Sequence, residues 1–416
     1  MEENMSENKL DYKKTFLLSF GFLASSIAWS IYNAYVPLLL ERFLQSTTMI
    51  GFVMVIDNIF GVIFQPVFGR LSDKTRTRFG RRMPYIFIGI PICAVAFILI
   101  PHMDNLWSLM AVLIIFTFVM SAWRSPVVSL MPDITPGPMR SQANGIVNLM
   151  GGVGSIIAFL GGGMLLNAGG YPLPFLMSAC VMIAALLVLV FFVREPKHAY
   201  EPEEKMKKTD VKLSKEERKS LLLILFGIFF WFTGYNAVET FFTLYATNTL
   251  GMADGTAGMT LAIFSITLVA FAIPAGFIGA RIGRRKAILI GLVGITLLFL
   301  PMIFFGNVWV VRICLFFAGV CWAMININSL PMVVRLSGDE KIGTYIGYYY
   351  FFSFSSQIIS PILFGFIRDL VGHYNVLFTY SCIAFSLAAV CLLFVRHGEE
   401  EPEKVTAAQV LENMDD

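Results

Sequence analysis

The stretch QPVFGRLSDKTRTRFGRRMPYI, residues 65–86, separates two apolar segments and carries a dense group of basic side chains. It holds one acidic residue, Asp73, and six basic residues: Arg70, Lys74, Arg76, Arg78, Arg81 and Arg82. Short loops rich in Lys and Arg between apolar segments of about 20 residues are typical of membrane proteins, in which such loops stay on the cytoplasmic side. We therefore predict a cytoplasmic loop between two transmembrane helices.

The composition of the whole chain agrees with this prediction. Of its 416 residues 57% are hydrophobic and only 14% are charged, and the mean hydropathy is +0.72. Soluble domains contain about 25% charged residues, so the chain cannot supply the charged surface of a soluble enzyme. The apolar segments do not alternate as the strands of a membrane β-barrel do. Soluble catalysis, nucleic-acid binding and secretion are therefore disfavoured.

Twelve apolar segments are long enough to cross a bilayer as helices. We predict spans near residues 15–40, 48–69, 83–101, 106–130, 142–167, 172–194, 220–246, 255–280, 286–305, 308–334, 342–368 and 373–396. One long charged segment interrupts them and indicates a solvated linker. We predict an N-terminal six-helix bundle over residues 1–194, a cytoplasmic linker over 195–219, a C-terminal six-helix bundle over 220–396 and a cytoplasmic tail over 397–416.

The distribution of basic residues predicts the orientation in the membrane. The loop after the second span is strongly basic, and the loop after the eighth carries Arg281, Arg284, Arg285 and Lys286. Loops on the other side, at residues 101–106, 167–173 and 247–255, contain no Lys or Arg. By the positive-inside rule, we expect both termini and the linker in the cytoplasm and the chain in the cell membrane.

Several short patterns recur in the two halves at an offset of about 202 residues. They are Trp29 with Tyr32-Asn33-Ala34 and Trp231 with Tyr235-Asn236-Ala237, and Gly80-Arg81-Arg82 and Gly283-Arg284-Arg285. Parallel repeats of six spans place a substrate site between the halves near the middle of the bilayer, and access to it alternates as the halves rock. The expected fold is thus an all-α polytopic membrane protein of twelve transmembrane helices in two pseudo-symmetric six-helix bundles.

The basic loop also resembles a family motif. Its G-x-x-x-D pattern followed by G-R-R, at residues 69–73 and 80–82, resembles the cytoplasmic loop motif of the major facilitator superfamily. The preceding Gln65-Pro66 and the segment SPVVSLMPDI at 125–134 are similar to the branch of plant sucrose–proton symporters, their animal relatives and bacterial homologues. The resemblance implies a transporter, with the sucrose and glycoside symporters as the branch.

Two positions depart from that branch. The resemblance would place its substrate-linked arginine of the fourth helix at Val128, and the acidic residue used for proton coupling at Thr117. Arg124 lies one turn before Val128 and so on the same helix face. The proton must then bind at another carboxyl group.

Asp73 is the acidic residue among the arginines of the basic loop. At a helix end it can accept charge-assisted hydrogen bonds from arginines or from the N-terminus of an opposing helix. We predict a latch whose contacts form only when the halves close on the cytoplasmic side, with Gly69, Asp73, Arg81 and Arg82 as gating residues. The alternative is a plain positive-inside anchor, which explains the arginines but not Asp73.

Three ionisable side chains stand out in the interior of predicted spans: Asp57, Arg124 and Glu239. Such residues cost at least about 2.5–3.5 kcal/mol in the bilayer and normally face a functional cavity. We expect Arg124 to bind or gate substrate, and Glu239, with Asp57 as its rival, to exchange the coupling proton. The alternative is a permanent structural ion pair between Asp57 and Arg124.

Amides, hydroxyls and aromatic faces are the groups that recognise sugars in a largely apolar pocket. The substrate-binding candidates besides Arg124 are Tyr32, Asn33, Asn58, Tyr235, Asn236, Trp322, Asn326 and Gln357. For each aromatic residue alone, helix packing or an interfacial belt is the competing interpretation. The Tyr-Asn-Ala repeat is a stronger indication, because a buried Asn needs partners or a wet cavity.

The fifth predicted span is rich in glycine, with Gly151, Gly152, Gly154, Gly161, Gly162 and Gly163. Small residues permit close helix approach. We expect this surface to pack against the eleventh span of the same chain, and we expect a monomer; the alternative is a face between two copies.

The leading functional hypothesis is proton-coupled symport of a sugar or glycoside across the cell membrane by alternating access. The alternatives are a proton-antiporting exporter of drugs or metabolites, a sugar uniporter, and a receptor or lipid-handling protein on the same scaffold. A receptor should not need acids inside the membrane in both halves, and an exporter should have few amides in its cavity. The pattern indicates no enzyme and no nucleic-acid partner. Neither the His nor the Cys spacing suggests a cofactor or metal.

Overall fold

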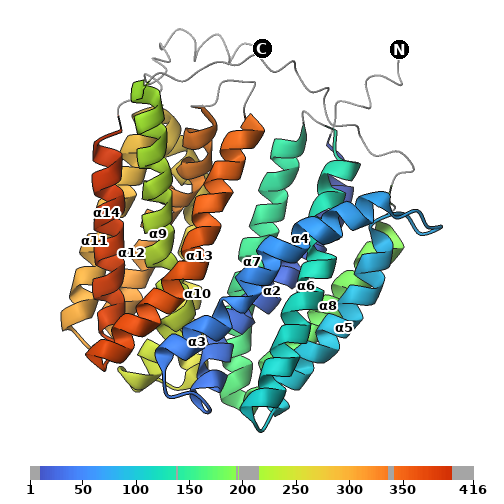
Figure 1. The fold of residues 1–416 in the computed structure, drawn as a ribbon, viewed down its shortest axis with the longest axis horizontal. Helices are drawn as coiled ribbons and strands as arrows, with labels where there is room; N and C mark the ends of the chain where they lie inside the picture. The colour runs from blue at the N-terminus through green and yellow to red at the C-terminus, as the bar shows by residue number, and fades with distance from the viewer. Residues whose placement is uncertain (1–9, 137–138, 194, 196–214, 336–341, 396–416) are drawn as a thin grey trace.

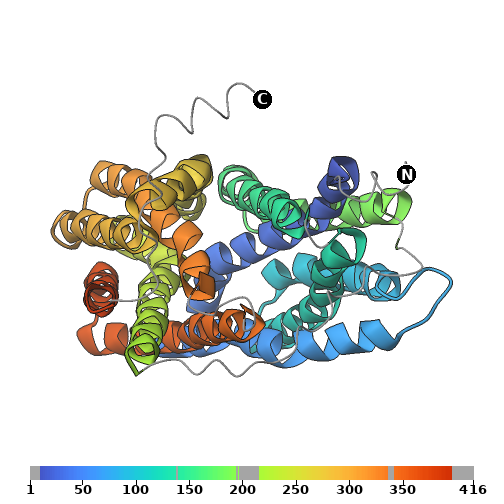
Figure 2. The same cartoon turned by 90° about the horizontal axis from the view of Figure 1, so that it is seen from above.

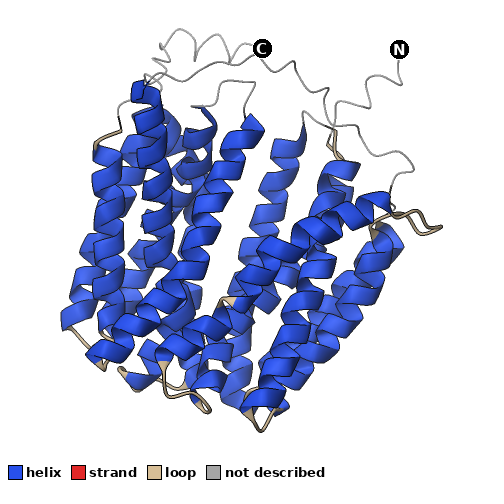
Figure 3. Ribbon diagram, viewed as in Figure 1, coloured by secondary structure: helices blue, strands red, loops and turns tan. Residues whose placement is uncertain are grey.

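The computed structural model describes residues 10–136, 139–193, 195, 215–335 and 342–395. Within these residues every regular element is helical (Figure 3). The helices are α2 (Tyr12–Glu41), α3 (Thr47–Met54), α4 (Ile56–Lys74), α5 (Met83–Leu99), the 3-10 helix η1 (Ile100–His102), α6 (Leu106–Ile134), α7 (Arg140–Gly169), α8 (Pro172–Phe192), α9 (Lys215–Asn248), α10 (Asp254–Ile282), α11 (Arg284–Phe304), α12 (Val308–Arg335), α13 (Ile342–Val371) and α14 (Val376–Leu393).

Twelve of the described helical segments are long and apolar enough to cross a membrane, which confirms the predicted fold class. The chain is therefore an integral membrane protein. The first half comprises α2–α8 and the second α9–α14, and they form two groups side by side (Figures 1 and 2). Of the predicted linker, residues 196–214 lie outside the described residues, and α9 already begins at Lys215.

We call the end of the bundle at which α2 begins and α14 ends the terminal face, at the top of Figure 1. The opposite end is the distal face. The halves meet through α7 against α10, α3 against α13, and α2 against α9. Because α3 lies at the distal end of the second span, the contact between α3 and α13 joins the halves at the distal face (Figure 1).

The second span is interrupted between two helical segments, which the sequence did not indicate. α3 ends at Met54 and α4 begins at Ile56, with Val55 between them. An interruption of this kind leaves backbone groups without their usual helical partners, and these need other partners at membrane depth. Asp57 lies in the first turn of α4 and supplies one, because its carboxylate accepts from the backbone N–H of Asn58 at 2.6 Å.

The glycine-rich face of α7 packs against α2 and α10, so the expectation that it meets the eleventh span is wrong. A Cβ at Gly154 would meet Leu23 and Ser26 of α2, and one at Gly163 would meet Gly255 and Met259 of α10. The small residues therefore permit close approach both within the first half and across to the second.

Candidate functional site

A polar cavity of about 430 Å³ lies inside the bundle between the two halves. α2, α3, α4, α6 and α7 of the first half and α9 and α13 of the second contribute its walls. Seven of the residues predicted from the sequence line it: Asn33, Asp57, Asn58, Arg124, Asn236, Glu239 and Gln357. The structure thus brings together polar side chains that lie up to 324 positions apart, between Asn33 and Gln357.

Of the three charged side chains of the cavity, Asp57 lies close enough to both Arg124 and Glu239 to interact with their charges. Among the described residues, however, neither carboxylate pairs with Arg124 within 4.0 Å. The buried Nε atom of Arg124 has no hydrogen-bond partner in the described part of the chain. The structure therefore does not support the alternative of a permanent Asp57–Arg124 ion pair, and leaves a buried donor beside the cavity.

The two cavity carboxylates have different surroundings. Asp57 is held at the N-terminus of α4, where the helix dipole stabilises a negative charge. Glu239 lies within the long helix α9, away from either end, and its polar neighbours are the Asn33 amide and the Tyr235 hydroxyl. Asp57 thus accepts a hydrogen bond at the break of the second span, whereas Glu239 lies beside Asn33 of the first half and Tyr235 of the second.

Four predicted substrate-binding residues do not line the cavity: Tyr32, Tyr235, Trp322 and Asn326. Tyr32 is fully buried and stacks on Phe116 with ring centroids 5.7 Å apart. Trp322 is 1% exposed and stacks on Tyr235, with ring centroids 4.3 Å apart and the ring planes nearly parallel. Asn326 lies one turn further along α12, outside the cavity wall. The prediction that these residues lie in the substrate cavity is therefore corrected. The side chains of Tyr32 and Trp322 are instead buried in the core, where they pack against neighbouring aromatic rings.

Other polar residues of the wall were not singled out by the sequence reasoning. On α2, Ser26 and Ser30 join Trp29 and Asn33 in a stripe at helical spacing, and Ser30 donates to Ser155 of α7 at 2.9 Å. Periodicity of small polar residues around Asn33 could have revealed this stripe. It adds hydroxyl groups to the amides and charges of the cavity.

A second hollow, of about 560 Å³, continues the cavity along α4 toward the terminal face. It shares Gly61, Gln65 and Phe354 with the cavity and reaches Asp73. The cavity is thus connected toward the terminal face.

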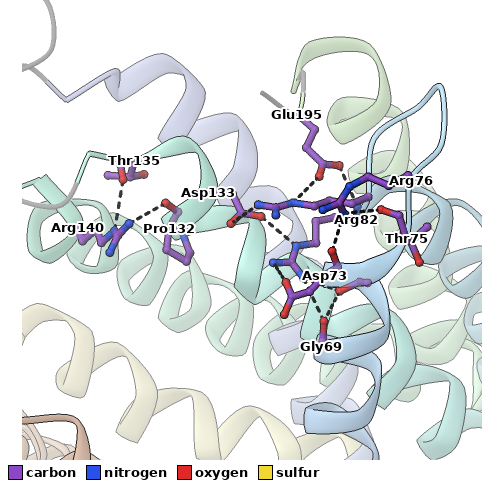
Figure 4. A network of polar contacts seen from close by, with 12 residues as sticks. Gly69, Asp73, Thr75, Arg76, Arg82, Pro132, Asp133, Thr135, Arg140 and Glu195 are labelled. Atoms are coloured by element: carbon purple, nitrogen blue, oxygen red, sulfur yellow. Dashed lines mark hydrogen bonds and ion pairs between the residues drawn. The ribbon is translucent and has the colours of Figure 1, made fainter. Parts of the chain in front are cut away.

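At the terminal end of the hollow, Asp73 belongs to a network of ion pairs within the first half (Figure 4). Arg82 is buried and reaches Asp73 at 2.5 Å and Asp133 at 3.0 Å. Arg81 pairs with Asp133 at 2.9 Å and with Glu195 at 3.3 Å. The predicted gating residues are therefore neighbours, but the pairing of Asp73 with arginine needs no closure of the halves. This differs from the expectation that the contacts of Asp73 form only on closure.

The distal face is joined across the halves through Asp369 near the end of α13. Its carboxylate accepts from the backbone N–H groups of Thr47 and Thr48, at 2.8 and 2.9 Å. It also accepts from the hydroxyls of Ser46 and Thr48, at 2.6 and 2.7 Å. Asp369 therefore caps the N-terminus of α3, where a negative charge is stabilised. We call these contacts the distal latch.

Further polar contacts join the halves on the same face. Glu41 accepts from Asn248 at 3.0 Å and from the Tyr374 hydroxyl at 3.2 Å. Tyr171 donates to Asp254 at the start of α10. Burial and the neighbouring Asp254 carboxylate raise the pKa of the Tyr171 hydroxyl, so it remains a donor at neutral pH. These contacts, together with the latch, hold the distal face closed.

The sequence contains a signal for the distal latch that the sequence reasoning missed. The pattern F-G-x-x-x-D occurs at residues 68–73 and again at 364–369. A Cβ at Gly365 would lie 2.6 to 2.8 Å from the backbone of Thr47 and Thr48, so glycine permits the close approach that Asp369 needs. Gly69 and Asp73 hold the corresponding positions at the terminal face, where the halves are apart.

No group of three or more His, Cys, Asp and Glu side chains in the described part of the chain could hold a metal ion.

Comparison with known proteins shows which family the chain belongs to. The model of the Major Facilitator Superfamily matches residues 18–257 and 243–412. Over 377 residues the chain is 24% identical to the class H tetracycline resistance protein of Pasteurella multocida, covering 86% of this chain and 90% of that one. It is 22% identical to the multidrug resistance protein MdtG of Salmonella arizonae, covering 86% and 89%.

Solved structures resemble the fold over nearly its whole length. A bacterial homologue of the human lysosomal transporter Spinster, in an inward-facing and occupied conformation, superposes with a TM-score of 0.70 at 13% identity, covering 93% of this chain and 95% of that one. The nucleoside transporter NupG, as its D323A mutant, superposes with a TM-score of 0.69 at 13% identity, covering 91% and 98%. By family match and by fold, the chain is a member of the Major Facilitator Superfamily of membrane transporters.

Proposed function

We propose that the protein is a proton-coupled antiporter that exports polar small molecules by alternating access. The observation that carries this proposal is that Asp57 and Glu239, one from each half, line the same cavity as Arg124 without pairing with it among the described residues. Ionisable groups inside a membrane are costly and normally serve a transported species. Because substrate and proton would share one cavity, binding of one would displace the other.

Export is supported by the relatives. The two curated proteins described above are named for resistance to tetracycline and to multiple drugs. The leading hypothesis drawn from the sequence was symport, because an exporter was expected to have few amides in its cavity. The proposal of export replaces that hypothesis. We therefore infer that the exported molecule is itself rich in hydrogen-bonding groups, since amides of Asn33, Asn58, Asn236 and Gln357 line the wall.

The same four amides favour a second candidate, symport of a sugar or glycoside. Sugars present many hydroxyls, which planar amides recognise well. In a symporter, the proton and the sugar occupy the cavity together, so each strengthens binding of the other. In an antiporter they compete. The sign of this coupling separates the two candidates.

We propose that the terminal face is cytoplasmic and that the protein works as a monomer in the cell membrane. The basic loops at residues 70–82 and 281–286 are both at the terminal face, as the positive-inside rule requires of cytoplasmic loops. The structure then corresponds to a conformation open toward the cytoplasm. Opening to the other side would break the distal latch and bring Asp73 to the first turn of α13.

The decisive experiment measures whether protons are released or taken up when substrate binds. The purified protein in weakly buffered detergent solution is mixed with tetracycline-class drugs or with a panel of disaccharides, and a pH indicator is followed. Antiport predicts proton release on binding of a drug, and loss of that release in Glu239→Gln. Proton uptake on binding of a disaccharide, with tighter binding at lower pH, would support the symporter instead.

A further inference from the structure

A groove of about 1,030 Å³ lies at the terminal face, apart from the central cavity. It is bounded by the loop between α4 and α5, the first turn of α5 and the last turn of α8. In Figure 1 this loop projects from the edge of the first half that is remote from the second half. The groove therefore opens at the outer edge of the bundle, at the level where α5 and α8 leave the membrane.

The loop that forms one wall of the groove has a defined turn. Thr77 donates through its hydroxyl to the Gly80 carbonyl at 2.6 Å, and the Gly80 N–H donates to the Thr77 carbonyl at 3.1 Å. Gly80 has φ of +108°, and a Cβ there would collide with the Glu195 side chain. Glycine is thus required at this turn, because of both its backbone conformation and the closeness of Glu195.

Two arginines of the loop have no carboxylate partner within the part of the chain that the structure describes. Arg81 is neutralised by Asp133 and Glu195, the latter being the acidic residue of the groove wall. Arg76 donates only to backbone carbonyls, those of Asp73 at 2.6 Å and Thr75 at 2.9 Å (Figure 4). Arg78 lies over the Phe79 ring at 4.6 Å and, among the described residues, forms no ion pair. The groove therefore has two positive charges that the described residues leave without an acidic partner.

Below these charges the groove is apolar. Phe79 packs edge-on against Phe87 of α5, with ring centroids 5.7 Å apart. Val190 and Phe191 of α8 form the opposite wall, and Phe191 is 71% exposed. From Arg78 through Phe79 to Phe87, the lining passes from a cation to an aromatic ring to the apolar side of a transmembrane helix. This order matches the order of a phospholipid from phosphate to acyl chain.

We propose that this groove binds an anionic phospholipid from the leaflet at the terminal face. Arg76 and Arg78 would hold the phosphate and the headgroup, and Phe79, Phe87 and Phe191 would contact the upper part of an acyl chain. Basic pockets beside transmembrane helices bind anionic lipid headgroups by this combination of charge and apolar contact. A free anion would use the arginines but not the apolar floor, so the lining favours a lipid.

The test uses the full chain, purified in detergent, with lipid binding followed by native mass spectrometry. Each basic residue near an anionic surface contributes about 1 kcal/mol, which corresponds to roughly fivefold in affinity. The double variant Arg76→Gln/Arg78→Gln should therefore bind phosphatidylglycerol roughly 25-fold more weakly than the unaltered protein. The matched control is Arg281→Gln/Lys286→Gln, which removes two exposed charges from the terminal face of the second half and should leave the affinity unchanged.

Two further measurements separate the lipid from other occupants. Phe191→Ser changes no charge and should also weaken binding of phosphatidylglycerol, whereas millimolar glycerol phosphate should fail to displace the lipid. Equal affinity in the double variant and its control would overturn the proposal, as would displacement by glycerol phosphate. Glu201, Glu203 and Glu204 lie outside the described residues; if replacing all three by Gln strengthened lipid binding fivefold or more, the linker would be the occupant and the proposal would fail.

Discussion

Replacement of Asp369 by Ala should open the distal face. Asp369 accepts four hydrogen bonds from Ser46, Thr47 and Thr48 across the two halves, and all four depend on the closed distal face. A hydrogen bond contributes about 0.5–1.5 kcal/mol net, and the partial exposure of Asp369 argues for about 0.7 kcal/mol each. Loss of four such bonds amounts to about 3 kcal/mol, or a roughly 150-fold shift toward the distally open state.

The population of the two states can be measured with spin labels on the distal face. Labels at Trp107 of α6 and Trp309 of α12 lie on different halves, and both side chains are largely exposed. In a background without reactive native cysteines, pulsed electron paramagnetic resonance gives the distribution of distances between them. Asp369→Ala should raise the ratio of long to short distances by roughly two orders of magnitude.

Asp104→Ala is the matched control for this experiment. Asp104 is also an exposed acid on the distal face, but it makes no contact across the halves among the described residues. Its replacement should leave the distance distribution unchanged. If Asp369→Ala folds, binds substrate and keeps the unaltered distribution, the latch does not hold the distal face and the reasoning from its hydrogen bonds is refuted.

Three other substitutions test the site and the terminal network. Arg124→Lys should weaken substrate binding at least tenfold in equilibrium titrations, because lysine lacks the planar fork that can hold a substrate at two points; unchanged affinity would assign Arg124 a structural role. Arg82→Ala should destabilise the protein by about 1.5–3 kcal/mol in thermal unfolding, because the buried Asp133 loses one charged hydrogen-bond donor and keeps only Arg81; an unchanged melting temperature would contradict this. Asp73→Asn should slow transport in proteoliposomes while equilibrium binding persists, and unchanged turnover would leave Asp73 only a topological role.

The sequence predicted the fold well because each span is long and apolar in itself. It also predicted seven residues of the cavity, since an amide or a charge inside a span must find a polar cavity. The repeat of Tyr-Asn-Ala has a structural counterpart: Tyr32 stacks on Phe116 of α6 and Tyr235 stacks on Trp322 of α12.

The remaining features depend on contacts between distant segments. Tyr32 and Trp322 are buried in the core because they stack on the rings of Phe116 and Tyr235. The spacing of residues along one helix cannot indicate such contacts with another helix. The partners of the glycine-rich helix α7 are set by packing within the first half and between the halves, and they are α2 and α10. The break at Val55 carries no Pro or Gly of its own, so it had no local signal.

The measurement that tests the central claim most directly is transport by Glu239→Gln in proteoliposomes. Neutralising the coupling carboxylate should abolish uphill movement of substrate driven by a pH gradient. Exchange of labelled substrate between equal pools should persist, because exchange moves no net proton. Asp57→Asn, in which the other cavity carboxylate is neutralised, should retain part of the uphill transport. If Glu239→Gln still concentrates substrate in response to the pH gradient, Glu239 is not the coupling residue and the account is contradicted.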